Sequence, residues 1–117
     1  MIVIPMAGNS RRFTAAGYNK PKFMLPLAGE SLFSHSVRSF ERYFSSMPFL
    51  FIAREDVDVG SFIDDEVARL GITDAQIVFL AGPTDGQAAT VEMGLNKAEI
   101  ADDASLTIFS IMYRFFI

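Results

Sequence analysis

The chain of 117 residues has the length of a single domain, and half of its residues are hydrophobic, which is enough for a packed core. It contains no cysteine, so disulfides and thiolate metal sites are excluded. Its net charge of −4 argues against a general nucleic-acid binder, because duplex binding needs a broad basic face. Without a signal-peptide pattern, or an apolar run of the about 20 residues that span a bilayer, we expect a cytoplasmic protein with no membrane partner.

Short apolar runs and helical patterns alternate along the chain and predict the order βαβαβαβ. Strands are predicted over residues 1–6, 49–53, 76–81 and 106–112, and helices over 31–44, 60–70 and 87–98. Ser31 is expected to cap the first helix and Gly71 to end the second. Strands that are apolar on both faces predict a mostly parallel sheet with helices on both sides, a three-layer α/β sandwich.

One stripe of each predicted helix is expected to face the core. The residues are Leu32, Phe33, Val37, Phe40 and Phe44 in the first helix, Phe62, Ile63, Val67 and Leu70 in the second, and Ala88, Val91, Leu95 and Ala98 in the third.

The long segment 7–30, between the first strand and the first helix, is the strongest candidate for function. Structureless segments of this length are uncommon in compact domains and are usually functional. Residues 1–29 carry a local charge of +4 from Arg11, Arg12, Lys20 and Lys22, whereas the remainder, with six basic against fourteen acidic residues, carries −8. Such a segment suits a small anion, although four solvated charges would give the same count.

Sheet topology brings this segment close to a second candidate. In an open parallel sheet, ligands bind beyond the carboxyl ends of the strands. The segment 7–30 leaves from that edge, and so does the glycine-containing turn 82–87 after the third strand. The basic residues and the turn are therefore expected on one rim.

Three stretches on this rim have the composition of an anion site. Ala7 and Gly8 let backbone N–H groups approach a phosphate, and Arg12 can clamp its oxygens, although a tight turn would explain the pair nearly as well. In residues 17–29 the prolines hold the backbone extended, and Lys22 projects toward the rim. In residues 82–91 a helix N-terminus favours an anion, while Asp85 as a simple cap is the alternative.

Together the three stretches resemble the signature of the sugar-phosphate nucleotidyltransferases, over residues 1 to about 109. That family opens with a strand, then A-G-x-G-x-R, then P-K-x-x-x-P-x-x-G before its first long helix. The residues in register are Ala7, Gly8, Arg12, Pro21, Lys22, Pro26 and Gly29, with Ser10 in place of the second glycine. The stretch from Gly86 is similar to the G-Q-A-x-T-V of capsule and lipopolysaccharide members. The resemblance implies a Rossmann-like half-sheet with strand order 3-2-1-4.

The resemblance also implies transfer of a nucleotidyl group from a nucleoside triphosphate to a sugar 1-phosphate, with release of pyrophosphate. Arg12 would stabilise the β- and γ-phosphates, and Lys22 would offset charge near the α-phosphate; these are the implied catalytic residues. The implied nucleotide-binding residues are Ala7, Gly8, Asn9, Ser10, Arg11, Arg12, Lys22, Gly86 and Gln87.

The end of the sequence departs from the family. Members carry an aspartate that binds Mg²⁺ at the end of the fourth strand, and Met112 stands there in this chain. A thioether is a poor ligand for Mg²⁺. We therefore expect a partial domain over residues 1–117, cut short by a frameshift or premature stop and inactive in this form. A non-catalytic nucleotide-binding or regulatory subunit, and a truncated product without function, remain open alternatives.

Three further expectations concern the other polar and apolar residues. His35, without a catalytic partner nearby in the sequence, is expected to be structural. The acidic residues Glu55, Asp56, Asp58, Asp64, Asp65 and Glu66 are expected to form a solvated face and not a metal site. The fourth strand is expected to leave a bare sheet edge, and the apolar C-terminal segment beside it is expected to drive self-association; the apolar residues of this segment are Leu106, Ile108, Phe109, Ile111, Phe115, Phe116 and Ile117.

Overall fold

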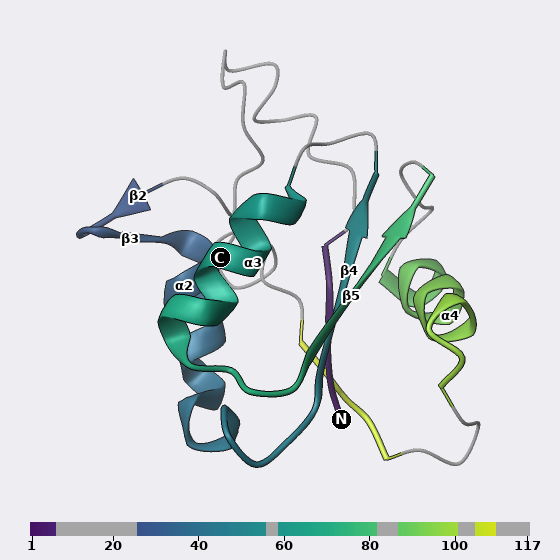
Figure 1. Cartoon of the computed structure of the whole chain (residues 1–117). Helices are drawn as coiled ribbons and strands as arrows, with labels where there is room; N and C mark the ends of the chain where they lie inside the picture. The colour runs from purple at the N-terminus through teal and green to yellow at the C-terminus, as the bar shows by residue number, and fades with distance from the viewer. Residues whose placement is uncertain (7–25, 56–58, 82–86, 101–104, 110–117) are drawn as a thin grey trace.

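A parallel sheet of four strands forms the centre of the protein. The computed structural model describes residues 1–6, 26–55, 59–81, 87–100 and 105–109. The strands are β1 (Ile2–Pro5), β4 (Phe49–Arg54), β5 (Ala75–Leu80) and β6 (Thr107–Ile108), and they lie in the order β5-β4-β1-β6 (Figure 1). All three pairings are parallel. The predicted order 3-2-1-4 is confirmed. The fourth strand is shorter than predicted, and its expected positions 110–112 lie outside the described residues.

Alternating side chains of the central strands build a core on each face of the sheet. On one face, Ile4 and Phe51 pack with Phe33 and Ile63 under α2 (Leu32–Val37) and α3 (Gly60–Leu70). On the other face, Leu50 and Ile52 pack under α4 (Gln87–Lys97). Figure 1 shows the two helical layers on opposite sides of the strands. The predicted covering of both faces is confirmed. Within the described segments, no helix combines the length and apolar character needed to cross a bilayer.

The first helix is not the single α-helix over 31–44 that its periodicity predicts. The α2 helix stops at Val37 and continues as a 3₁₀ helix, η2 (Arg38–Tyr43), with a break at Phe40 (φ −109°, ψ 20°). Tight turns of this kind are frequent at the C-terminal ends of α-helices. The predicted apolar stripe still faces the core, because Phe44 is buried and Phe40 packs edge-on against Phe109, with ring centroids 5.0 Å apart.

The second helix agrees with its prediction at both ends. The α3 helix spans Gly60–Leu70, and Gly71 ends it in the left-handed region (φ 83°) with its N–H directed to the carbonyls of Val67 and Ala68. Glycine is suited to this position because it has no Cβ to oppose a positive φ. Ile63 is fully buried.

The third helix presents the predicted face except at its first position. Val91 is buried and Leu95 and Ala98 pack against the core as expected, whereas Ala88 is exposed; Thr90 and Gly94 are buried as well. At Gly94 the helix approaches the sheet closely, since an added Cβ would lie 2.2 Å from Cδ1 of Ile52. A larger residue at position 94 would hold α4 away from β4.

A short hairpin occupies the end of the predicted irregular segment 7–30. Strand β2 (Pro26–Leu27) pairs antiparallel with β3 (Glu30–Ser31), as a sheet separate from the main one. Its two turn residues both have positive φ, 52° at Ala28 and 87° at Gly29, as the tightest hairpin turns require. The hairpin leads directly into α2, whose N-cap is Ser31 as predicted: the Ser34 N–H donates to Ser31 Oγ over 3.0 Å.

The contact at Gly94 can be tested by adding one methyl group. We expect Gly94→Ala to destabilise the protein by about 1–3 kcal/mol, as overpacking does in other cores. Alanine is intrinsically the better helix former, by roughly 0.5–1 kcal/mol, so the loss would come from the contact with Ile52, which is fully buried. Urea denaturation measures the change.

Two controls separate this contact from a general effect of alanine. Gly60→Ala should cost less, because its methyl would meet only the ring of Phe79, 3.2 Å from Cζ. The double variant Gly94→Ala/Ile52→Ala should lose less than the sum of the two single losses, since a shorter residue 52 makes room. Additive losses would contradict the contact.

Candidate functional site

The carboxyl ends of three neighbouring strands form the candidate site. Pro5 of β1 lies opposite Ile52 of β4, and Arg54 at the end of β4 lies opposite Leu80 of β5. Backbone hydrogen bonds continue the ladder past the strands, from the Met6 N–H to the Ile52 carbonyl over 2.7 Å and from the Glu55 N–H to the Leu80 carbonyl over 2.8 Å. The segments that follow all three strands therefore leave from one edge, where parallel sheets bind ligands.

Most of the predicted site residues lie in the signature segment, residues 7–25, and the structure describes only the residues on either side of it. Ala7, Gly8, Asn9, Ser10, Arg11, Arg12, Lys22 and Gly86 lie outside the described residues, and Gln87 is described only as the first backbone position of α4. The segment 7–25 begins after Met6, which is buried at the end of β1, and ends at the hairpin strand β2. The location of the predicted anion site on this rim stays a prediction, and the described structure fixes where its segment starts and ends.

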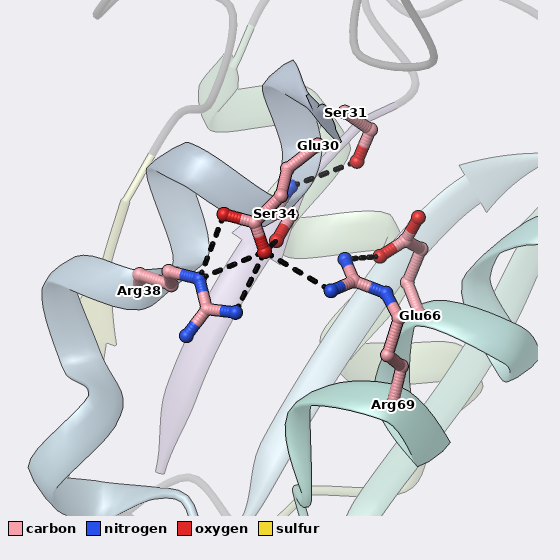
Figure 2. A network of polar contacts seen from close by, with 6 residues as sticks. All are labelled: Glu30, Ser31, Ser34, Arg38, Glu66 and Arg69. Carbon is pink, nitrogen blue, oxygen red and sulfur yellow. Dashed lines mark hydrogen bonds and ion pairs between the residues drawn. The ribbon is translucent and has the colours of Figure 1, made fainter. Parts of the chain in front are cut away.

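A carboxylate at the hairpin gathers donors from three other parts of the fold (Figure 2). Glu30 Oε1 accepts from Ser34 Oγ (3.1 Å) on α2, from Arg38 Nη2 (2.6 Å) and Nε (3.1 Å) on η2, and from Arg69 Nη1 (3.0 Å) on α3. Arg38 Nε also lies 3.2 Å from Oε2. Arg69 is shared, because its Nη2 donates to the Glu66 carboxylate one turn earlier on α3.

The charges of this cluster reinforce one another. Hydrogen bonds from Arg38 first, and then from Arg69, lower the pKa of Glu30 to about 2. In return, Glu30 raises the pKa of Arg38, and Glu66 followed by Glu30 raises that of Arg69. Glu30 is therefore ionised at any physiological pH, and its carboxylate links the hairpin to α2, η2 and α3.

The sequence did not indicate this cluster. Arg69 lies 39 residues from Glu30, so no local spacing could have revealed the pair. Glu66 was assigned to a solvated acidic face, and the structure corrects this, because its side chain is only 15% exposed and is paired with Arg69. Asp64, Asp65 and Glu55 are exposed as expected, whereas Asp56 and Asp58 lie outside the described residues. His35 is half-buried on α2.

Comparison with known proteins identifies a relative of this architecture. Over 95% of its length, the chain matches the crystal structure of a nucleoside-diphosphate-sugar pyrophosphorylase from Vibrio cholerae RC9, with 48% sequence identity and a TM-score of 0.87. The match covers 47% of that protein, so the chain spans about half of its length. No family model and no curated protein matches the chain. The resemblance seen in the sequence motifs is confirmed, and the homology is to the N-terminal part of the pyrophosphorylase.

The charge of Glu30 should make part of the stability depend on pH. Its pKa is about 2 in the folded protein, below the ordinary value of 4.5. Its contribution is therefore complete above pH 4.5 and is lost as the pH falls toward 2. We expect wild type to be more stable than Glu30→Gln at pH 7, and this difference to shrink as the pH is lowered to about 3. Urea denaturation across this range measures both proteins.

The matched control is Glu92→Gln, on the opposite face of the sheet. Glu92 is exposed on α4 and forms no ion pair with the residues that the structure describes. Its substitution should leave a difference from wild type that changes less with pH than that of Glu30→Gln. A difference between wild type and Glu30→Gln that stays constant from pH 7 to 3 would argue against the ionised cluster.

Proposed function

We propose that this chain, which is 48% identical to the N-terminal part of a nucleoside-diphosphate-sugar pyrophosphorylase, is a member of the sugar-phosphate nucleotidyltransferase family and binds a nucleoside triphosphate at the carboxyl ends of β1, β4 and β5. One observation carries the proposal. The signature segment, with its A-G-x-x-x-R and P-K-x-x-x-P-x-x-G motifs, starts one residue beyond Met6, at the edge where the carboxyl ends of the central strands meet. Four basic residues and no acidic residue lie within positions 1–29, which favours a polyanionic ligand.

The proposed roles follow the motifs. Arg12 binds the β- and γ-phosphates with its fork of donors, and Lys22 neutralises charge near the α-phosphate. Asn9, Ser10 and Arg11 complete the phosphate loop. The nucleobase lies against three small residues and one side-chain amide, which follow the first and third strands of the sheet; these are Ala7, Gly8, Gly86 and Gln87.

In the complete family reaction, a sugar 1-phosphate attacks the α-phosphate and pyrophosphate leaves, so catalysis consists mainly of positioning and charge neutralisation. The relative's name describes this chemistry for a protein about twice as long. For this chain, we propose transfer of the nucleotidyl group to a sugar phosphate. We also propose that residues 1–117 form a single partial domain and that the protein is cytoplasmic.

Magnesium is the cofactor that the family implies, and the donors of this chain do not fit it. Met112 stands where family members carry the metal-binding aspartate, and a hard cation prefers oxygen ligands. Position 112 lies outside the described residues, and among those described no group of three or more Asp, Glu or His side chains could hold a metal ion. No step is therefore assigned to a metal here. This favours a second candidate function, nucleotide binding without turnover.

Binding of nucleoside triphosphates tests the proposal directly. Titration calorimetry with ATP, CTP, GTP, UTP and dTTP should find at least one ligand. Arg12→Ala and Lys22→Ala should each weaken its binding by about 1.5–3 kcal/mol, the usual range for a hydrogen bond to a charged group. Arg42→Ala is the control, since Arg42 lies on η2 and stacks near Tyr43, 5.6 Å from its ring centroid.

Equal affinity of wild type, Arg12→Ala and Lys22→Ala for every triphosphate would refute the proposed site. Pyrophosphate release separates the two candidate functions. Binding without release supports the non-catalytic form, whereas sustained release in the presence of magnesium and a sugar phosphate would show that Met112 does not prevent turnover.

The outer edge of β6 supports a proposed self-association. The strand lies at the end of the sheet, pairs with β1, and leaves Ile108 45% exposed. An exposed apolar edge strand is a template for pairing with another chain. We expect wild type to associate at high micromolar concentration in sedimentation velocity, and Ile108→Lys to reduce that association. Met93→Lys is the control, because Met93 is similarly exposed but lies on α4. A clean wild-type monomer would contradict this.

A further inference from the structure

An apolar groove lies between α4 and the edge strand β6. It has a volume of about 610 Å³ and is lined by Ala88, Val91, Glu92 and Leu95 of α4 and by Ile108 of β6. Every lining residue except Glu92 is apolar, and Ile108 is 45% exposed. Contiguous apolar surface that is open to solvent often marks an interaction site.

The groove lies beside the less covered face of β6. Ile108 pairs with Val3 of β1, whose side chain belongs to the core under α4, so Ile108 lies on the α4 side of the sheet. On the other side, Phe109 packs edge-on against Phe40 of η2, with ring centroids 5.0 Å apart. Among the described residues, β6 therefore has an aromatic cover on the η2 side, whereas Ile108 on the α4 side is open.

The groove also accounts for the exposure of Ala88. This residue lies on the stripe that was predicted to face the core, three positions before Val91 and seven before Leu95. Val91 is buried but Ala88 is exposed, and both line the groove. The apolar stripe of α4 thus continues past the strands that it covers, onto a surface that a further element can bury.

The handedness of the crossovers indicates on which side such an element lies. Connections between parallel strands are right-handed in nearly all proteins. The chain accordingly passes over the α2 and α3 face from β1 to β4 and β5, and over the α4 face when it returns from β5 to β6 (Figure 1). A further crossover outward from β6 would continue in the same direction, and the same rule puts it on the α4 face.

The Vibrio cholerae relative is long enough to supply such an element. The match covers 95% of this chain, so it extends past β6, and it covers 47% of the relative. Because the chain corresponds to the N-terminal part of the relative, the unmatched half follows the position of β6 in the sequence. Successive elements of a chain usually neighbour one another in space. The unmatched half therefore starts next to the groove.

We propose that the α4–β6 groove is the docking surface for the second half of a pyrophosphorylase domain, the polypeptide that corresponds to the unmatched part of the relative. Apolar side chains of that polypeptide cover Ala88 and Ile108 and complete the core on the α4 face. The inference uses the homology to the pyrophosphorylase and is independent of nucleotide binding.

Coexpression tests the docking. The chain of 117 residues is produced together with the unmatched half of the Vibrio cholerae pyrophosphorylase, which carries an affinity tag. We expect the wild-type chain to copurify with the tagged half. Ala88→Arg should lower the copurified amount by about tenfold or more, because an unpaired charge in an apolar contact loses its hydration. Since Ala88 is exposed, its urea denaturation midpoint should stay that of wild type.

Met93→Arg is the matched control. Met93 is also exposed on α4, at 50%, and is not among the residues that line the groove, so this variant should copurify as wild type does. Amide hydrogen exchange supplies a second measurement. Exchange in α4 and β6 should be slower in the copurified complex than in the chain alone, whereas exchange in α3, on the opposite face, should be unchanged.

The outcomes separate the possible occupants of the groove. Absence of copurification would overturn the proposal, and weaker self-association of Ala88→Arg in sedimentation would then assign the groove to a second copy of this chain. Equal copurification of wild type and Ala88→Arg, or slower exchange in β6 alone, would place the contact at the strand edge and overturn the role of the groove.

Triphosphate titration keeps this proposal distinct from the proposed function. A chain that binds no triphosphate but copurifies with the second half would refute the nucleotide site and support the docking surface. A chain that binds a triphosphate and fails to copurify would do the reverse.

Discussion

The burial of the two central strands on both faces is the constraint on which the rest of the structure depends. Val3 and Ile4 of β1, and Leu50 to Ile52 of β4, are completely buried. Burial of a large apolar side chain stabilises a protein by about 1.5–3 kcal/mol, so neither face can be left to solvent. Helices must cover both, and the parallel arrangement that allows this places the carboxyl ends of β1, β4 and β5 at one edge.

The burial of both faces of the central strands also limits where polar, ligand-binding side chains can lie. The central strands have no polar side chain before Arg54, because both of their faces are used for packing. Polar residues are therefore confined to the segments that follow the strands. The long segment after β1 has room for such residues, and the motifs found there resemble those of the sugar-phosphate nucleotidyltransferases.

The spacing of apolar residues correctly predicted the helices and strands whose bounds depend on neighbouring residues in the sequence. The α3 helix was predicted to the residue, because its apolar spacing and the glycine at position 71 are local signals. On α4 the predicted face is correct except at Ala88, and the close contact between Gly94 and Ile52, 42 positions earlier in the chain, gave no local signal. The break at Phe40 and the pair of Glu30 with Arg69 likewise depend on tertiary neighbours. For the site, motifs predicted residue types and their order, and they carried no information on what holds the hairpin.

The two ends of the signature segment are held by different physical interactions. At its start, Met6 is buried and its N–H bonds the Ile52 carbonyl, so this end is part of the core and is little affected by salt. At its other end, partly exposed charges hold Glu30, and such charges are screened by ions and by competing anions. The hairpin end is therefore expected to loosen as the salt concentration rises, whereas the β1 end is held by the core.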